Sequence, residues 1–180
     1  GGKVVLNLVS RELLHKSDVG GVRVGLHSAQ DVREAYDAIL ANVSQQAPAV
    51  PREGILVAHQ LVARAELMLG ARWDDTFGPI VVLGLGGVAV ELDAKTVVLT
   101  APTTPQRVRT QLEHLGILKR LHAWRGQPAI DPTSLVNIIV RFAALADTLG
   151  PRLRTMEINP LMVTNEGAFA ADAVVEIATN

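Results

Sequence analysis

The sequence predicts a mixed α/β (α+β) protein in which strands and helices follow one another without strict alternation. Apolar residues make up 48% of the chain but aromatic residues only 3%, so a core has to be built from Val, Leu, Ile and Ala. Several short runs are rich in β-branched residues, and longer segments carry apolar residues at helical spacing. At 180 residues the chain can form one domain, or two lobes that share a hinge.

The first part of the chain is expected to contain a strand, a loop, a strand and a helix. Residues 4–9 have the β-branched content of a buried strand, and residues 10–21 are polar and turn-forming. Residues 22–26 alternate as a second strand should. Ser28 is placed to cap a helix.

A hinge is predicted at residues 47–54, which are dense in proline and other helix or strand breakers. We therefore expect a first lobe at residues 1–54 and a second at residues 55–180. The predicted first strand follows directly after Gly1 and Gly2, whereas a natural domain seldom begins inside its core. This predicts a fragment with an incomplete N-terminal lobe.

The second lobe is expected to begin with strands and continue with helices. Thr104 and Pro105 open one helix, and Asp131 to Thr133 cap a longer helix that ends at Gly150. A short helix is expected around residues 117–121. The expected strands are residues 55–62, 66–72, 79–83, 88–92, 96–99, 155–158 and 168–175, with residues 159–163 separating the last two.

Charge and composition argue against several classes of function. The 17 basic and 18 acidic residues leave a net charge of −1, which offers no long-range attraction for nucleic acid or an anionic membrane. The absence of cysteine removes disulfides and thiolate chemistry. The longest apolar stretch, residues 79–90, is shorter than the roughly 18 residues of a membrane span, and no signal peptide is visible. We therefore expect a cytoplasmic protein without nucleic-acid or membrane partners.

The run Gly84-Leu85-Gly86-Gly87 follows an apolar strand. Without a Cβ in the way, its backbone N–H groups could approach phosphate oxygens. A tight turn between two strands is an equally good interpretation of this run alone.

Glu157, Asn159 and Asp172 form a sharper candidate site. Residues two apart on a strand share a face, and a hairpin return would bring Asp172 opposite the other two. Carboxylate and amide oxygens suit Mg²⁺ that is shared with substrate phosphates. The alternative is that Asn159-Pro160 only starts a turn and that Asp172 bonds locally.

His15 and Lys16 lie on a polar loop that ends in Gly20 and Gly21. Such loops often carry function, and histidine can act as nucleophile, base or phosphate carrier. The alternative is a solvated surface histidine. The other four histidines have no partners at a useful spacing and are interpreted as structural.

Together these motifs extend over nearly the whole chain. The first motifs are the strand at residues 4–10, the loop His15-Lys16-Ser17-Asp18-Val19-Gly20-Gly21-Val22, and Glu66. The later motifs are Asp74 with Phe77-Gly78-Pro79, Gly84-Leu85-Gly86-Gly87 and Glu157-Ile158-Asn159-Pro160-Leu161. This succession resembles the ATP-grasp domain of the ADP-forming (NDP-forming) acyl-CoA synthetases, relatives of the succinyl-CoA synthetase β subunit. The resemblance implies an ATP-grasp fold, with two lobes around a nucleotide cleft.

The resemblance also implies a reaction and its site residues. Family members interconvert acyl-CoA, ADP and phosphate with acid, CoA and ATP through an acyl phosphate and a phosphohistidine on separate CoA-binding and ligase portions. ATP or ADP and Mg²⁺ are the implied cofactors. His15 matches a loop histidine that relays the phosphoryl group, with Lys16 as a nearby cation. The implied metal site is Glu157, Asn159 and Asp172, and the implied nucleotide contacts are Gln60, Leu61, Val62, Glu66, Gly84, Gly86 and Gly87.

Two positions depart from the family pattern. Asn7 stands where the first strand of the family carries a lysine that reaches the phosphates, and Leu99 stands where an arginine is usual. These losses leave room for a second interpretation, a non-catalytic ATP-grasp module that regulates a protein acetyltransferase. A third is a fragment that folds and binds nothing. Retention of His15, Glu157, Asn159 and Asp172 favours the enzyme, since a module freed from catalysis has no physical need for that set.

Overall fold

The computed structural model describes residues 2–10, 12–13, 16–86, 95–123 and 126–178. The chain divides into two compact units, residues 1–61 and residues 62–180. The sequence places the division after Gly54, but the strand that begins there pairs with the first strand of the chain. The contacts therefore divide after Leu61, seven residues later than expected.

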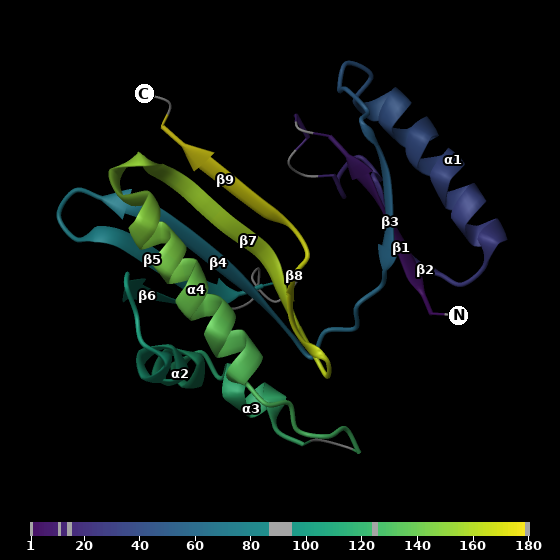
Figure 1. Cartoon of the computed structure of the whole chain (residues 1–180). Helices are drawn as coiled ribbons and strands as arrows, with labels where there is room; N and C mark the ends of the chain where they lie inside the picture. Colours follow the sequence, from purple (N-terminus) through teal and green to yellow (C-terminus); the bar gives the residue numbers. More distant parts are fainter. Residues whose placement is uncertain (1, 11, 14–15, 87–94, 124–125, 179–180) are drawn as a thin grey trace. The chain divides into compact units, whose positions relative to one another are not determined.

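Unit 1 is a three-stranded antiparallel sheet with one helix. Strands β1 (Val4–Val9), β2 (Val22–Leu26) and β3 (Gly54–His59) lie in the order β2-β1-β3 (Figure 1). Helix α1 (Ala29–Gln46) begins with a capping box, in which the Ser28 hydroxyl accepts from the Asp31 N–H and the Asp31 carboxylate accepts from the Ser28 N–H. Helix and sheet bury Leu6, Leu8, Leu26, Ala35, Ile39 and Val43 between them.

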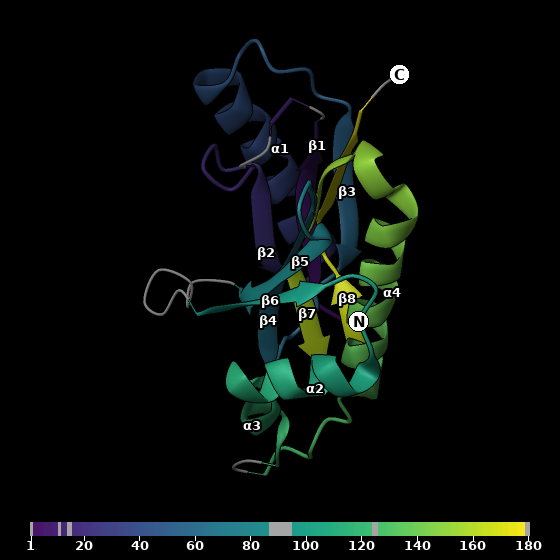
Figure 2. The ribbon, with the colours of Figure 1, turned by 90° about the vertical axis from the view of Figure 1, so that its left-hand side faces the viewer.

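Unit 2 is a larger antiparallel sheet with helices. Its strands are β4 (Ala65–Asp74), β5 (Gly78–Leu85), β6 (Thr96–Thr100), β7 (Leu153–Thr164), β8 (Gly167–Ala170) and β9 (Ala173–Ile177). They lie in the order β6-β5-β4-β7-β8, and β9 also pairs with β7. The helices are α2 (Pro105–His114), α3 (Ile117–Leu121) and α4 (Thr133–Leu149), followed by a short 3₁₀ helix at Gly150–Arg152. In both views α2 and α3 lie together near one end of α4 (Figure 2).

One face of this sheet builds the core, because buried and less buried residues alternate along the strands. On β4 the buried members are Ala65, Leu67, Leu69 and Ala71, and they pack with residues of α2, α3 and α4. Residues 133–152 are long and apolar enough to cross a membrane by length and composition alone. In this fold α4 instead buries Leu135, Val136 and Ile139 in the core, as expected for a core helix of a globular domain.

The expected mixture of strands and helices is confirmed, with one correction at the C-terminal end. Residues 159–163 do not separate two strands, because β7 continues through them and pairs with β4 on both sides of Asn159 and Pro160. The expected strand 168–175 is in fact β8 and β9, two strands that pair with different parts of β7. The expected strand 88–92 lies outside the described residues.

Candidate functional site

The predicted metal-binding set lies where β7 meets the connection between β8 and β9. The backbone N–H of Asn159 donates to the Asp172 carbonyl oxygen at 3.1 Å, so these two residues lie opposite each other. The Asn159 side-chain N–H₂ donates to Glu157 Oε1 at 3.2 Å. Asp172 Oδ1 accepts from the Ala173 N–H at 2.9 Å. The three residues predicted from the sequence are thus neighbours in the fold.

A β-bulge decides which face of β7 these side chains occupy. Leu69 pairs with Ile158 and Leu67 pairs with Leu161, so β7 has one residue more than β4 between these pairs. Ile158 and Leu161 both belong to the apolar side of the sheet. Glu157 and Asn159 therefore lie on the opposite side, and Asn159 is exposed.

This donor set fits a hard divalent cation. The Asn159 amide nitrogen is occupied by Glu157, which leaves its carbonyl oxygen directed elsewhere and available as a ligand. Two carboxylates and one amide oxygen are too few for an all-protein cage, but they suit Mg²⁺, which keeps waters and takes phosphate oxygens. Within the described residues, no group of three or more histidine, cysteine and acidic side chains is placed to hold a metal ion, so a site here would depend on the amide oxygen of Asn159 as well.

The glycine-rich run has a packing role in the described part of the chain. Gly84 and Leu85 are the last residues of β5, and the Gly86 N–H donates to the Glu66 carbonyl oxygen at 2.8 Å. A Cβ on Gly86 would lie 2.8 Å from the Leu67 carbonyl carbon, so only glycine fits there. The N–H of Gly86 is therefore already bonded, and Gly87 lies outside the described residues. A phosphate contact from this run stays a prediction.

Gln60, Leu61 and Val62, the predicted adenine contacts, span the division between the units. The Gln60 side-chain oxygen accepts from the Gly25 N–H at 2.6 Å, and its backbone N–H donates to the Lys3 carbonyl oxygen. Gln60 is thus fixed to the sheet of unit 1. Val62 is 76% exposed, which leaves its side chain available to a ligand.

The loop predicted to carry His15 is described from Lys16 onward, and His15 itself lies outside the described residues. A tight turn closes the loop, with the Gly20 N–H donating to the Ser17 carbonyl and the Gly21 N–H to the Lys16 carbonyl. Gly20 has φ = +65°, which favours glycine. The turn thus explains Gly20-Gly21 structurally, and the chemical roles of His15 and Lys16 stay predictions.

The two departures from the family pattern have different surroundings. Leu99 is 5% exposed and belongs to the apolar core of unit 2, so a hydrophobic side chain suits this position. Asn7 lies on β1, and its side-chain oxygen is buried without a hydrogen-bond partner among the described residues. An unsatisfied polar atom in the central strand of this sheet is unusual and marks Asn7 as a site to test.

Three aspartates that accept hydrogen bonds from nearby backbone N–H groups have lowered pKa values. The backbone N–H of Phe77, and then that of Thr76, lowers the pKa of Asp74 by bonding its carboxylate. The His27 backbone N–H and the Ser28 hydroxyl lower the pKa of Asp31, and the side chain and N–H of Thr133 lower that of Asp131. All three carboxylates are therefore occupied in local structure, and Asp74 caps the turn between β4 and β5.

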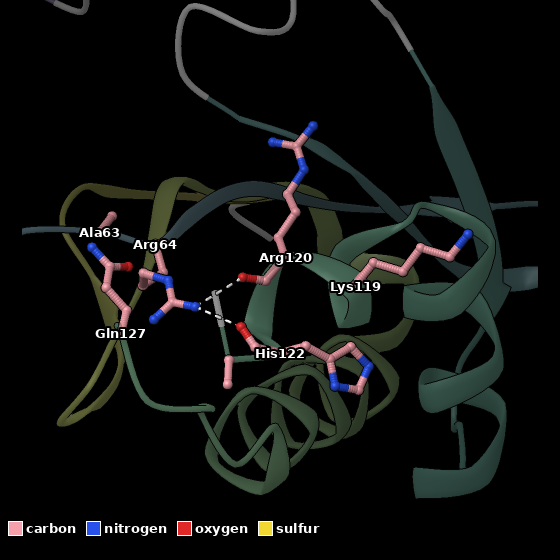
Figure 3. Close-up of a pocket in the computed structure, with 7 residues that line it drawn as sticks. Ala63, Arg64, Lys119, Arg120, His122 and Gln127 are labelled. Carbon is pink, nitrogen blue, oxygen red and sulfur yellow. Dashed lines mark hydrogen bonds between the residues drawn. The ribbon is translucent and has the colours of Figure 1, made fainter. Parts of the chain in front are cut away.

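A region that the sequence analysis missed is a hollow of about 460 Å³ in unit 2. It is lined by Ala63, Arg64, Lys119, Arg120, His122, Ala123 and Gln127 (Figure 3). These residues come from the segment before β4 and from the end of α3 and the loop after it. The sequence alone predicts a structural role for His122, because no partner lies at a useful spacing. The available signal was the basic sequence Lys119-Arg120-Leu121-His122.

Comparison with known proteins gives a consistent result. Residues 1–177 match the ATP-grasp domain family. The chain is 31% identical over 173 residues to the acetate–CoA ligase (ADP-forming) I subunit beta of Pyrococcus furiosus, covering 96% of this chain and 74% of that subunit. It is 31% identical over 172 residues to acetate–CoA ligase (ADP-forming) I of Archaeoglobus fulgidus, covering 96% of this chain but 25% of that protein.

A solved structure agrees with these sequence matches. It is the dinucleotide forming acetyl-coenzyme A synthetase 1 of Ca. Korarchaeum cryptofilum in complex with coenzyme A, Ca-AMPCP and HgCl⁺. The TM-score is 0.86 at 35% sequence identity, covering 99% of this chain and 77% of that chain. The chain thus spans about three quarters of the subunit-type relatives but only a quarter of the longer ligase.

Proposed function

We propose, since this chain belongs to the ATP-grasp domain family of the ADP-forming acyl-CoA ligases, that it forms the nucleotide-binding part of an acid–CoA ligase. The complete enzyme would interconvert acyl-CoA, ADP and phosphate with acid, CoA and ATP. Similarity to a β subunit and to part of a longer ligase supports a role as one part of a larger enzyme. The ligase names of these relatives also favour this function over the regulatory module.

The observation that carries the proposal is the arrangement of Glu157, Asn159 and Asp172. Phosphoryl transfer depends mainly on positioning and on neutralising charge at the phosphates. A bound Mg²⁺ would supply that neutralisation between the protein oxygens and the nucleotide. Asn159 would offer its amide oxygen and Asp172 a carboxylate oxygen, while Glu157 orients the Asn159 amide through their hydrogen bond.

Further parts of the chain would hold and deliver the other groups. His15 would accept the phosphoryl group from a phosphohistidine on the CoA-binding and ligase portions, which breaks one P–N bond and forms another. It would then pass the group to ADP, which breaks that P–N bond and forms a P–O bond. Lys16 would offset negative charge on that loop. Gln60 to Val62 would contact the base, while Glu66 and the Gly84–Gly87 run would border the phosphates. A cytoplasmic location fits the cysteine-free sequence.

The test is calorimetric titration of this chain with Mg-ADP and with Mg-ATP, with and without EDTA. Asp172→Ala and Asn159→Ala are expected to weaken metal-dependent binding by about tenfold or more, because each removes an oxygen ligand. Asp147→Ala is the matched control, since Asp147 is an exposed carboxylate on α4.

Circular dichroism should show that all variants fold. Unchanged binding in both site variants would contradict the proposed metal site. Absence of nucleotide binding to the unmodified chain would contradict nucleotide binding by this domain alone, and Asn7→Lys would then test whether the missing cation is the cause.

A further inference from the structure

The hollow in unit 2 has an unusual charge for a chain that is nearly neutral overall. Among its described lining residues, Arg64, Lys119 and Arg120 are cations, while none is acidic. The remaining polar side chains are His122 and Gln127. The whole chain has a net charge of −1. Positive charge is therefore concentrated locally in this hollow, which raises the local concentration of small anions.

Arg64 forms a wall of the hollow. Its guanidinium donates to the carbonyl oxygens of Pro128 at 3.0 Å, His122 at 2.8 Å and Arg120 at 3.3 Å. These bonds tie the segment before β4 to the end of α3 and the loop that follows (Figure 3). Arg64 thus fixes the shape of the hollow, and most of its donors are already used.

Lys119 and Arg120 differ from Arg64 because their charged groups remain available. Both lie in the last turn of α3 and are exposed. No acidic side chain within the described residues forms an ion pair with either of them. Figure 3 shows the two side chains leaving α3 in different directions at the edge of the hollow that they line.

We propose that this hollow binds a small anion through its phosphate group. Lys119 and Arg120 would supply the charge, His122 and Gln127 would supply hydrogen bonds, and Arg64 would hold the wall. Arginine and lysine donors match phosphate oxygens, and the volume lies in the range of small-molecule sites. The site shares no residue with the Glu157, Asn159 and Asp172 set, and it does not rest on the proposed function.

Phosphate could come from inorganic phosphate or from a phosphorylated organic molecule. The first measurement is calorimetric titration of the whole chain with inorganic phosphate, ADP and coenzyme A, each with EDTA present to suppress the metal-dependent nucleotide site. The test variant is Lys119→Gln with Arg120→Gln. The control variant is Arg107→Gln with Arg152→Gln, which removes the same charge from exposed positions of unit 2 outside the hollow.

At least one probe should bind the unmodified chain in EDTA. The test variant should weaken that binding by about tenfold, because two partly solvated charges are lost, while the control changes it less than about twofold. Binding should also weaken between 50 and 300 mM salt. If phosphate alone binds, inorganic phosphate is the source, and if only ADP or coenzyme A binds, the source is an organic phosphate.

Two results would overturn the proposal. One is that no probe binds in EDTA, and the other is that the test and control variants lose affinity equally. Asp172→Ala separates this site from the proposed nucleotide site, since it should leave metal-free phosphate binding unchanged. Its loss of Mg-ADP binding would not affect the conclusion about the hollow.

Discussion

The two units differ in the size of the core that each builds on one face of its sheet. In unit 1, α1 packs on one face of three strands, and the other face carries the exposed Val24 and Leu56, which are 63% and 55% exposed. In unit 2, three helices and five strands, β4 to β8, share a continuous core that extends from Ala65 to Ala168. Burial of apolar area is the main source of stability, so unit 2 should be the more stable of the two.

The largest expected effect comes from removing a core side chain in each unit. Ile39→Ala in unit 1 and Ile139→Ala in unit 2 should each cost about 2–5 kcal/mol, because both side chains are fully buried. In the smaller unit this loss should open α1 and the β-strands while unit 2 stays folded. Hydrogen exchange of the backbone amides in unit 1 and in unit 2 would measure this local opening.

Equal loss of protection in both units after Ile39→Ala would contradict this comparison. It would mean that the two units unfold together. Urea unfolding should then show one transition, whereas independent units should show two.

A smaller effect is expected from glycines within unit 2. Gly86→Ala should destabilise the protein by about 1–3 kcal/mol, because the added Cβ would lie against the Leu67 backbone. Gly70→Ala is the control, since no atom lies within 4 Å of the added Cβ. It should be neutral or slightly stabilising in thermal melts. Similar losses in both variants would refute the packing role of Gly86.

The smallest expected effect is on how the stability of each unit declines at acid pH. The pKa of Asp31 is lowered in the folded state, so its contribution to stability is present above the unfolded pKa of about 4 and is lost as pH falls below it. Asp31→Asn should therefore flatten the decline of unit 1 stability between pH 5 and pH 3. Asp74→Asn should do the same for unit 2. Melting followed by circular dichroism over this range would show whether the slopes change.

Local sequence signals predicted most of the elements. Ser28 and Thr104 cap α1 and α2 as expected, because caps depend on residues within one turn. The error at residues 159–163 came from treating Asn159-Pro160 as a breaker, although a bulge accommodates it within a strand. The contacts divide the chain after Leu61 because β3 pairs with the distant β1, and such pairing is not a local property of the sequence.

For the candidate sites too, the sequence predicts local contacts but not contacts between distant residues. The proximity of Asp172 to Asn159 could be predicted, because a hairpin brings residues of known spacing together. The hollow could not, because Arg64 bonds to carbonyl oxygens 56 to 64 residues away. Periodicity contains no information about such contacts, although the basic sequence of α3 was visible.

The bulge in β7 changes which alternate residues of the strand face the core. Directly before it, Met156 and Ile158 face the core, and after it, Leu161 and Val163 do. One strand can thus supply core residues at both ends while Glu157 and Asn159 lie on the other face. The single extra residue lets a polar site exist in the middle of a hydrophobic strand. Its removal would exchange the inner and outer faces of everything that follows.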